Sequence, residues 1–327
     1  MYKPSFTISS YMLEKSISIA NKIGKISFYE SLERMPILRR NNKIKSVYSS
    51  LVIEANSLSL EQVKDVIAGK MVIGSQKDIQ EVNNAYKAYE MIHNFDGFDE
   101  QDLLKAHGIL TYLIDDESVR YRNHAEGVKD GDRIIFIAPL EELVPKLMSD
   151  LFEWLNDDKE TPILIKSCIF HYEFVFIHPF KDGNGRTARL WQNVLLSKWN
   201  NIFEYLPIES QIKKYQEDYY KAISNSRING NSNCFIEFML KMIDESLDET
   251  ILLSEKESKN ISEKVNKLLE VMDYDIPLLA IELINRLKIK SKETLRDSYL
   301  KPAIKNGLVK MTLPDKPSSK NQRYYKK

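Results

Sequence analysis

Twelve consecutive residues concentrate most of the chemistry that this chain could perform. Segment 178–189 reads His-Pro-Phe-Lys-Asp-Gly-Asn-Gly-Arg-Thr-Ala-Arg, which places an imidazole, a carboxylate, an amide and two guanidinium groups close together. Its two glycines let the backbone approach a ligand closely. Such a segment could hold a polyphosphate and a metal ion beside a proton acceptor.

The first half of the segment contains the candidate base and the candidate metal ligand. His178 is the potential proton acceptor, and Asp182 is the only carboxylate in the segment, suited to a Mg²⁺ ion shared with phosphates. If a helix begins after this loop, the N–H groups of Gly183, Asn184 and Gly185 lie near its unpaired end. The positive end of a helix dipole favours anions, so these residues predict a phosphate site.

The second half contains two guanidinium groups. Arg186 and Arg189 are three residues apart on one side of the expected helix, so both could reach the same anion. The segment is not a P-loop, because no Gly-Lys-Ser/Thr follows it. It is also a poor zinc site: His171 and His178 could share a helix face, but no third ligand lies at a suitable spacing.

Two helices are expected to flank this loop. Residues 161–177 are apolar nearly all round, which is typical of a buried central helix. Thr161 is expected to cap this helix and Pro162 to occupy its first position. Pro179 disfavours helical backbone at His178, so the helix should end there. The next helix should begin between residues 184 and 186.

The segment resembles, without a mismatch, the Fic family signature His-x-Phe-x-Asp/Glu-Gly-Asn-Gly-Arg-x-x-Arg. Three further features are similar to that family: Tyr121-Arg122, a β-prone hairpin over residues 127–139, and the pair Tyr219-Tyr220. In motif order the resemblance covers about residues 40–245. It implies a mainly α fold, in which a Fic-type helical bundle bears a β-hairpin flap.

The resemblance also implies a reaction, the transfer of AMP from Mg-ATP to a Ser, Thr or Tyr hydroxyl of a target protein, whose identity the sequence does not give. His178 would be the general base and Asp182 the Mg²⁺ ligand. The phosphate-binding residues would be Gly183, Asn184, Gly185, Arg186 and Arg189. The nucleotide pocket would include Tyr219 and Tyr220. The flap would dock the target by β-augmentation through Ile134, Ile135, Phe136 and Ile137.

Residues 50–56, Ser-Leu-Val-Ile-Glu-Ala-Asn, resemble the family's inhibitory motif Ser/Thr-x-x-x-Glu-Gly/Asn. The resemblance assigns Ser50 and Glu54 to auto-inhibition, with Glu54 competing with the ATP γ-phosphate for Arg189. The motif precedes the signature, as in the N-terminally inhibited class. Ala55 departs from the Gly/Asn pattern, which leaves the geometry of this helix end open. Removal of AMP from a modified protein, or another phosphate transfer, remains an alternative activity.

Three regions are expected from the patterning. These are an N-terminal helical region (1–75) that packs on the core and carries the inhibitory motif, a Fic core (76–248) and a C-terminal domain (249–327). In the last region, helical patterns begin at Val265, Leu279 and Ser291, and β-like pieces follow at 308–313 and 323–325. This order resembles a winged helix.

Residues 286–327 contain thirteen basic and three acidic residues, so their net charge is +10, while the whole chain is neutral. Such a surface could hold DNA phosphates, an acidic partner or a neighbouring chain in a homodimer. The competing interpretation is therefore a DNA-binding regulator whose bundle senses a nucleotide. Cys168 and Cys234 are expected to be buried free thiols. No signal peptide or membrane span is expected, which favours a cytoplasmic protein.

Overall fold

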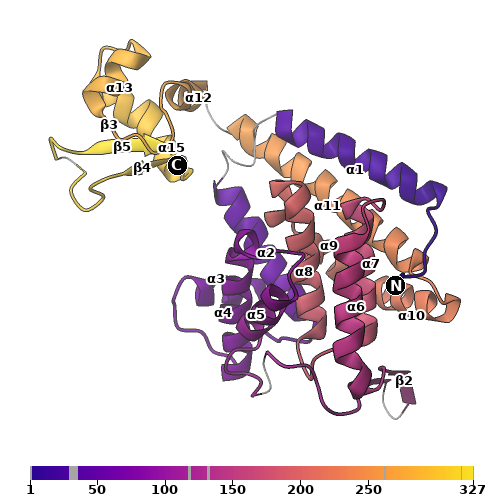
Figure 1. Ribbon diagram of the computed structural model, residues 1–327. Coiled ribbons are helices and arrows are strands. Elements are labelled where there is room, and N and C mark those ends of the chain that lie inside the picture. The colour runs from indigo at the N-terminus through magenta and orange to yellow at the C-terminus, as the bar shows by residue number, and fades with distance from the viewer. Residues whose placement is uncertain are drawn as a thin grey trace. The chain divides into compact units, whose positions relative to one another are not determined.

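The computed structural model describes residues 2–28, 36–116, 119–130, 133–260, 263–317 and 319–326. The fold is mainly helical, as the apolar periodicity predicts, with two small antiparallel sheets among the described residues (Figure 1). The longer helices up to residue 260 are α1 (Ser10–Phe28), α2 (Pro36–Ile53), α3 (Leu60–Ile67), α4 (Gln76–Glu90), α5 (Glu100–Leu110), α6 (Val144–Asp157), α7 (Ile163–Ile177), α8 (Asn184–Trp199), α9 (Ile208–Lys214), α10 (Gln216–Asn229) and α11 (Asn233–Asn260).

The chain divides into two compact units. The first comprises Met1–Ile23 and Asn42–Leu247, and the second comprises Gly24–Asn41 and Asp248–Lys327. The first unit thus unites most of the expected N-terminal region with the expected core. Residues 24–41 group with the C-terminal unit, which the sequence pattern did not indicate.

Helices α7 and α8 form the centre of the first unit and lie side by side (Figure 1). Helix α7 buries residues on every side, as its composition predicts. The expected start of α7 was wrong by one position: Pro162 is the N-cap, and the Thr161 hydroxyl instead donates to Asp158. Asp158 captures this hydroxyl because its carboxylate also accepts from the Thr161 N–H, at 3.0 Å.

Helix α1 runs along α11 within the first unit (Figure 1). The Asp244 carboxylate of α11 binds the ammonium groups of Lys15, at 2.9 Å, and Lys22, at 2.7 Å, and accepts from the Ser18 hydroxyl. These cations hold the pKa of Asp244 below its usual value although burial opposes the shift. The start of the chain is thus fastened to the outer helix of the bundle.

The expected hairpin is present as β1 (Gly127–Asp130) and β2 (Arg133–Ile137), paired antiparallel with a register shift between Val128 and Lys129. Its predicted turn at residues 131–132 lies outside the described residues, as do the side chains of Ile134 and Ile135. The hairpin lies beside the loop that follows α7. Arg122 connects the two, because its guanidinium donates both to the carbonyl of Pro139, two residues after β2, and to the carbonyl of His178.

The second unit combines short helices with a three-stranded sheet of order β3-β5-β4. Its elements are α12 (Glu263–Glu270), β3 (Leu278–Leu279), α13 (Ala280–Leu287), α14 (Lys292–Thr294), a π-helical segment (Leu295–Leu300), α15 (Lys301–Lys305), β4 (Val309–Met311) and β5 (Arg323–Lys326). The π-helical segment precedes Pro302, whose missing N–H prevents regular α-helical bonding there. Only β3 was not expected, because two residues carry no period-2 pattern.

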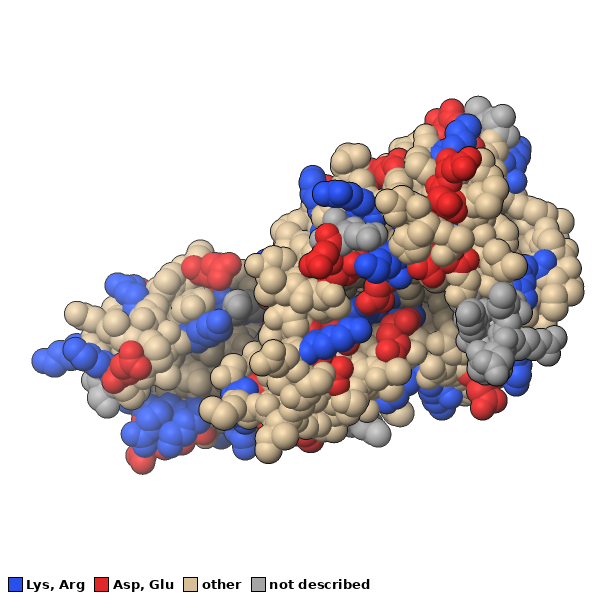
Figure 2. Space-filling model, turned by 90° about the horizontal axis from the view of Figure 1, so that it is seen from below, with Lys and Arg blue, Asp and Glu red and all other residues tan. Residues whose placement is uncertain are grey.

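Charge and composition agree with the sequence analysis in most respects. On the face drawn in Figure 2, Lys and Arg side chains lie among Asp and Glu side chains, in keeping with a net charge of zero. None of the described helices is both long and apolar enough to span a bilayer. Both cysteines are free, as predicted, but only Cys168 is buried, while Cys234 is partly exposed.

Candidate active site

The loop between α7 and α8 begins and ends as its prolines and glycines predict. Helix α7 ends at His178, whose left-handed backbone (φ 52°) turns the chain, and α8 begins at Asn184 after Gly183 (φ 81°). The Asn184 side chain closes the loop: its Oδ1 accepts from the Phe180 N–H at 2.9 Å and its Nδ2 donates to the Phe180 carbonyl at 2.7 Å. These two bonds tie the first residue of α8 back to the middle of the loop.

An aromatic stack supports this loop from α5. The His107 imidazole lies parallel to the Phe180 ring, with 3.6 Å between their centroids, and its Nε2 lies 3.0 Å from the Asp182 carbonyl oxygen. Burial lowers the pKa of His107 to about 4, so this ring is neutral near pH 7. His107 thus supports the loop from α5.

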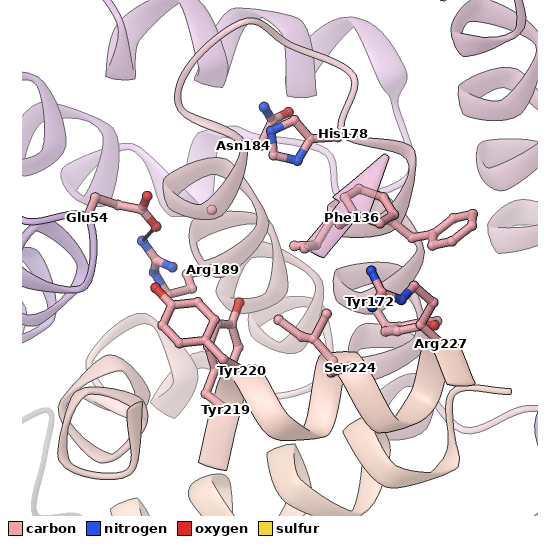
Figure 3. A pocket seen from close by; sticks show the side chains of 14 residues that line it. Glu54, Phe136, Tyr172, His178, Asn184, Arg189, Tyr219, Tyr220, Ser224 and Arg227 are labelled. Carbon is pink, nitrogen blue, oxygen red and sulfur yellow. Dashed lines mark hydrogen bonds and ion pairs between the residues drawn. The ribbon is translucent and has the colours of Figure 1, made fainter. Parts of the chain in front are cut away.

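A cleft of about 320 Å³ opens beside the loop. His178, Asn184, Gly185 and Arg189 line it together with Glu54, which comes from the end of α2 (Figure 3). The remaining lining residues are Phe136, Tyr172, Val175, Phe176, Tyr219, Tyr220, Ile223, Ser224 and Arg227. The imidazole, the start of α8 and one signature guanidinium therefore share one concave, mostly apolar site, the kind of place where ligands bind.

Glu54 is paired with Arg189 inside this cleft. Its Oε1 lies 2.8 Å from Arg189 Nη2, and Ser50 accepts from the same guanidinium through its hydroxyl (3.1 Å) and its carbonyl oxygen (2.9 Å). Arg189 is almost fully buried; burial opposes its charge, but the Glu54 carboxylate outweighs this and raises the pKa of Arg189. The guanidinium is therefore charged and already occupied.

The end of α2 forms a tight C-cap despite the unexpected alanine. Ala55 adopts the left-handed conformation (φ 64°), its N–H donates to the Val52 carbonyl, and the Asn56 N–H donates to the Leu51 carbonyl. These two bonds are those of the Schellman motif, in which this position is usually glycine. Glu54 is thus held at a defined helix end.

Arg186 has different partners from Arg189. Its Nη1 lies 3.0 Å from Glu81 on α4, and its Nη2 lies 3.0 Å from the Asp182 carboxylate. The expectation that both arginines face one anion is not met in this arrangement, because the buried Glu81 carboxylate attracts Arg186. The Arg186 Nε is buried with no hydrogen-bond partner among the described residues, so one donor of this group remains unused.

Asp182 is partly exposed and ionised. Burial opposes its charge, yet the Arg186 guanidinium and the Gly183 N–H hold the pKa of Asp182 below its usual value. Both of these neighbours contact Oδ1. The described residues contain no cluster of three or more His, Cys, Asp or Glu side chains that could hold a metal ion. A cation here would need oxygen ligands from a bound substrate.

Arg122 fastens the loop between α7 and α8 to the hairpin, a role that sequence reasoning missed. Its Nε donates to the His178 carbonyl at 2.8 Å, Nη1 to the His124 carbonyl at 2.8 Å and Nη2 to the Pro139 carbonyl at 2.6 Å. One guanidinium thus connects the residue that carries the imidazole to both ends of the hairpin. The only signal in the sequence was its place in the Tyr121-Arg122 pair.

Burial lowers the pKa of His178, so its imidazole is neutral near pH 7 and able to accept a proton.

The expected tyrosines also line the cleft: Tyr219 is buried, whereas Tyr220 is about half exposed. Of the hairpin residues, Phe136 lines the cleft, and Ile137 is exposed. The sequence analysis missed Arg227 of α10, which lines the end of the cleft away from Glu54 (Figure 3). The Arg227 guanidinium lies 5.5 Å from the centre of the Phe136 ring.

Two family models match this chain. The Fic/DOC family matches residues 97–196, and the model described as "Filamentation induced by cAMP protein Fic-like, C-terminal domain" matches residues 263–325. Curated relatives include protein adenylyltransferase fic-1 of Caenorhabditis elegans, 27% identical over 266 residues, and protein adenylyltransferase Fic of Nematostella vectensis, 28% identical over 215 residues. These alignments cover 78% and 62% of this chain, but only 49% and 47% of the relatives, so the chain spans about half of their length.

Solved structures extend the likeness to the whole chain. The crystal structure of a Fic family protein from Desulfovibrio desulfuricans G20 is 38% identical, covers 100% of this chain and 98% of its own, and superposes with a TM-score of 0.76. Residues 134–508 of Fic-1 from C. elegans share the fold at 22% identity, with a TM-score of 0.62 over 75% of this chain and 73% of that one. The chain belongs to the Fic family.

Proposed function

We propose that this protein transfers AMP from Mg-ATP to a hydroxyl group of a protein, and that Glu54 inhibits the reaction. The observation that carries the proposal is the meeting of His178, Asn184, Gly185 and Arg189 in one cleft. The names of the curated relatives support the same activity.

In the proposed reaction, the hydroxyl oxygen of Ser, Thr or Tyr attacks the α-phosphorus of ATP. His178 takes the hydroxyl proton, the bond between the α-phosphorus and the bridging oxygen breaks, and pyrophosphate leaves. The neutral, partly buried His178 imidazole suits this role, and a well-placed general base contributes about 10²–10⁴-fold in rate. The N–H groups at the start of α8 would hold the phosphates, together with the unused Nε donor of Arg186.

Asp182 would suit Mg²⁺ as a carboxylate ligand that acts together with the phosphates of ATP. Mg²⁺ often binds through one or two carboxylates and the phosphates of a substrate. Asp182 offers a partly exposed, ionised carboxylate whose contacts with the described residues use Oδ1. When bound, the ion would neutralise charge on the phosphates.

Auto-inhibition follows from the occupied guanidinium. Carboxylate and phosphate oxygens both form charge-assisted bonds with arginine, so they compete for one site. Because Glu54 and Ser50 already use the Nε and Nη2 donors of Arg189, outer phosphates of ATP that bind these donors would have to displace Glu54. The lining tyrosines, Tyr219 and Tyr220, would accommodate the nucleoside, and the hairpin would place the target hydroxyl near His178.

The proposal is tested with the Glu54→Gly protein, Mg²⁺ and ATP labelled on either the α- or the γ-phosphate. We expect the α-label on Ser, Thr or Tyr of the enzyme itself or of a lysate protein. The additional change His178→Ala should abolish labelling, whereas the exposed His93→Ala should not. Transfer of the γ-label would indicate phosphotransfer instead, and release of AMP from a labelled protein would indicate the reverse activity. No label from either would reject the transferase.

A second function concerns the C-terminal unit, which we propose is a winged helix that contacts DNA. Its helices and the strands β4 and β5 follow the expected order, and eleven basic side chains between residues 286 and 323 are exposed. Lys326 does not belong to this surface, because it is buried and its ammonium group donates to the Leu269 carbonyl. DNA affinity should fall steeply as salt rises, and no binding at low salt would reject the proposal.

A further inference from the structure

The inhibitory segment and the catalytic loop are joined by a second chain of contacts, which does not include Arg189. It runs through Glu81, a residue of α4 that no sequence motif marks. The Glu81 carboxylate is buried and uses both oxygens: Oε1 lies 3.0 Å from Arg186 Nη1, and Oε2 accepts from Asn56 Nδ2 at 2.8 Å. Arg186 in turn contacts Asp182 at 3.0 Å.

We propose that Glu81 is a positioning residue that couples the inhibitory segment 50–56 to the phosphate-binding loop. The proposal deepens the auto-inhibition proposed above and rests on it. Glu81 would have two roles: it anchors the residue that follows the Glu54 helix end, and it orients the guanidinium beside Asp182.

The first role follows from how Asn56 is held. Its side chain donates to Glu81 and, at 3.2 Å, to the Asp78 carbonyl of the same helix, while its Oδ1 accepts from the Leu58 N–H at 3.1 Å. Asn56 is buried, and its N–H completes the cap of α2. The position of Glu54, two residues earlier, therefore depends on the contacts between Asn56 and α4.

The second role follows from the burial of Arg186. This side chain is only 3% exposed and has carboxylates as its partners, so its charge is stabilised mainly by Glu81 and Asp182. Any ligand that draws Asp182 away from Arg186 leaves Glu81 as the remaining partner. Coupling of this kind is reciprocal: a change at Asp182 affects Asn56, and a change at Asn56 affects Asp182.

A carboxylate suits this position because both of its oxygens accept hydrogen bonds. Glutamine has the same shape but offers one acceptor and one donor group. In Glu81→Gln the oxygen should turn towards the charged Arg186, which leaves the amide NH₂ facing the NH₂ of Asn56. The substitution should thus break the contact with Asn56 and weaken the contact with Arg186 without leaving a cavity.

The test compares Asn56→Ala, Glu81→Gln and the control Lys87→Ala, an exposed residue on the same helix, in the natural and the Glu54→Gly background. In the natural background, Asn56→Ala should raise automodification with labelled ATP about fivefold, within the range of coupling between contacting residues. Glu81→Gln should raise it less, because this change also weakens the contact with Arg186. In the Glu54→Gly background, Glu81→Gln should lower kcat/KM for ATP about fivefold, and Asn56→Ala should change it less, because Asn56 reaches Arg186 only through Glu81. Lys87→Ala should leave both backgrounds unchanged.

Hydrogen–deuterium exchange provides a readout that needs no turnover. Amides of residues 50–57 should exchange faster in Asn56→Ala and Glu81→Gln than in Lys87→Ala, while α7 remains protected. Faster exchange throughout the first unit would show a purely structural role and overturn the coupling. Unchanged exchange and unchanged rates for Asn56→Ala and Glu81→Gln, measured while the Glu54→Gly protein is active, would also overturn the coupling. If Glu54→Gly itself transfers no label, the proposed function is rejected instead. The deuterium exchange of residues 50–57 would still test the contact between Asn56 and Glu81.

Discussion

The Glu54 carboxylate lies over Gly185, at the first turn of α8, where it meets the Arg189 guanidinium at 2.8 Å. A Cβ atom on residue 185 would collide with Glu54 Oε1 and would lie 3.1 Å from Arg189 Nη1. The carboxylate therefore occupies the space that the second signature glycine leaves open at the positive end of the helix dipole, which is also where a phosphate would bind. In the proposed account, Glu54 and a phosphate of ATP would thus require the same atoms.

This contact predicts that Gly185→Ala destabilises the protein through Glu54. Glu54 can move aside, because the clashing atom is the end of its side chain, so the cost is roughly the 1.5–3 kcal/mol of its charge-assisted contact with Arg189. Most of this loss should disappear in the Glu54→Gly background, where the carboxylate is absent. Thermal unfolding of the single and double variants measures this coupling. Gly24→Ala is the control, because no atom of the described residues lies within 4 Å of its Cβ position outside its own helix and chain neighbours. Equal losses in both backgrounds would contradict the prediction.

A second prediction concerns the left-handed alanine at the end of α2. Ala55→Gly should relieve the strain at φ 64° and raise the free energy of unfolding by about 0.5–1 kcal/mol, after the loss to chain entropy. Because Glu54 would be held at least as firmly, basal transfer should not rise. Ala68→Gly, where φ is −82°, should give no such gain. Chemical denaturation of both variants checks the difference, and a loss of stability in Ala55→Gly would refute it.

The environment of His178 predicts how the rate depends on pH. Burial lowers its pKa below the ordinary value of about 6.5, so the neutral base predominates above that pH. In the Glu54→Gly protein the rate should be constant above about pH 6.5 and should fall in more acidic solution, with a midpoint below 6.5. The Glu54 carboxylate raises the pKa of His178, so its removal should move the midpoint of the pH profile to a lower pH. A midpoint above 6.5 would contradict this account.

The contacts of Arg122 predict a loss of catalysis with little loss of fold. Arg122→Lys keeps the charge but cannot reach the carbonyl groups of His178, His124 and Pro139 at once. We expect kcat/KM to fall about 10–100-fold in the Glu54→Gly background, with helical content preserved by circular dichroism. The neighbouring exposed Arg120→Lys should have no effect. Full activity of Arg122→Lys would show that the connection between loop and hairpin is dispensable.

Local sequence signals predicted much of the fold and of the loop. Pro179 and the apolar run before it located the end of α7, and α8 begins at Asn184, within the expected range of 184–186. These features depend on residues only a few positions apart. Their physical causes, proline geometry and apolar composition, can therefore be read from the sequence alone.

Contacts between distant segments could not be read in that way. Glu81 is 105 positions from Arg186, and nothing in the helical pattern of α4 distinguishes it from a surface glutamate. The pairing of Arg122 with three carbonyl groups is equally invisible, because backbone acceptors have no sequence signature. For the same reason the sequence placed Arg186 and Arg189 on one anion, whereas tertiary contacts give the two groups separate partners.

The most direct test of the account compares initial rates of AMP incorporation by the natural protein and by Glu54→Gly at Mg-ATP concentrations well below KM, where competition for Arg189 lowers the rate. Releasing a charge-assisted contact of about 1.5–3 kcal/mol should raise the rate at least about tenfold. The exposed Glu61→Ala should match the natural protein. Equal rates for the natural protein and Glu54→Gly, with both correctly folded, would contradict the claim that Glu54 keeps Arg189 from the nucleotide.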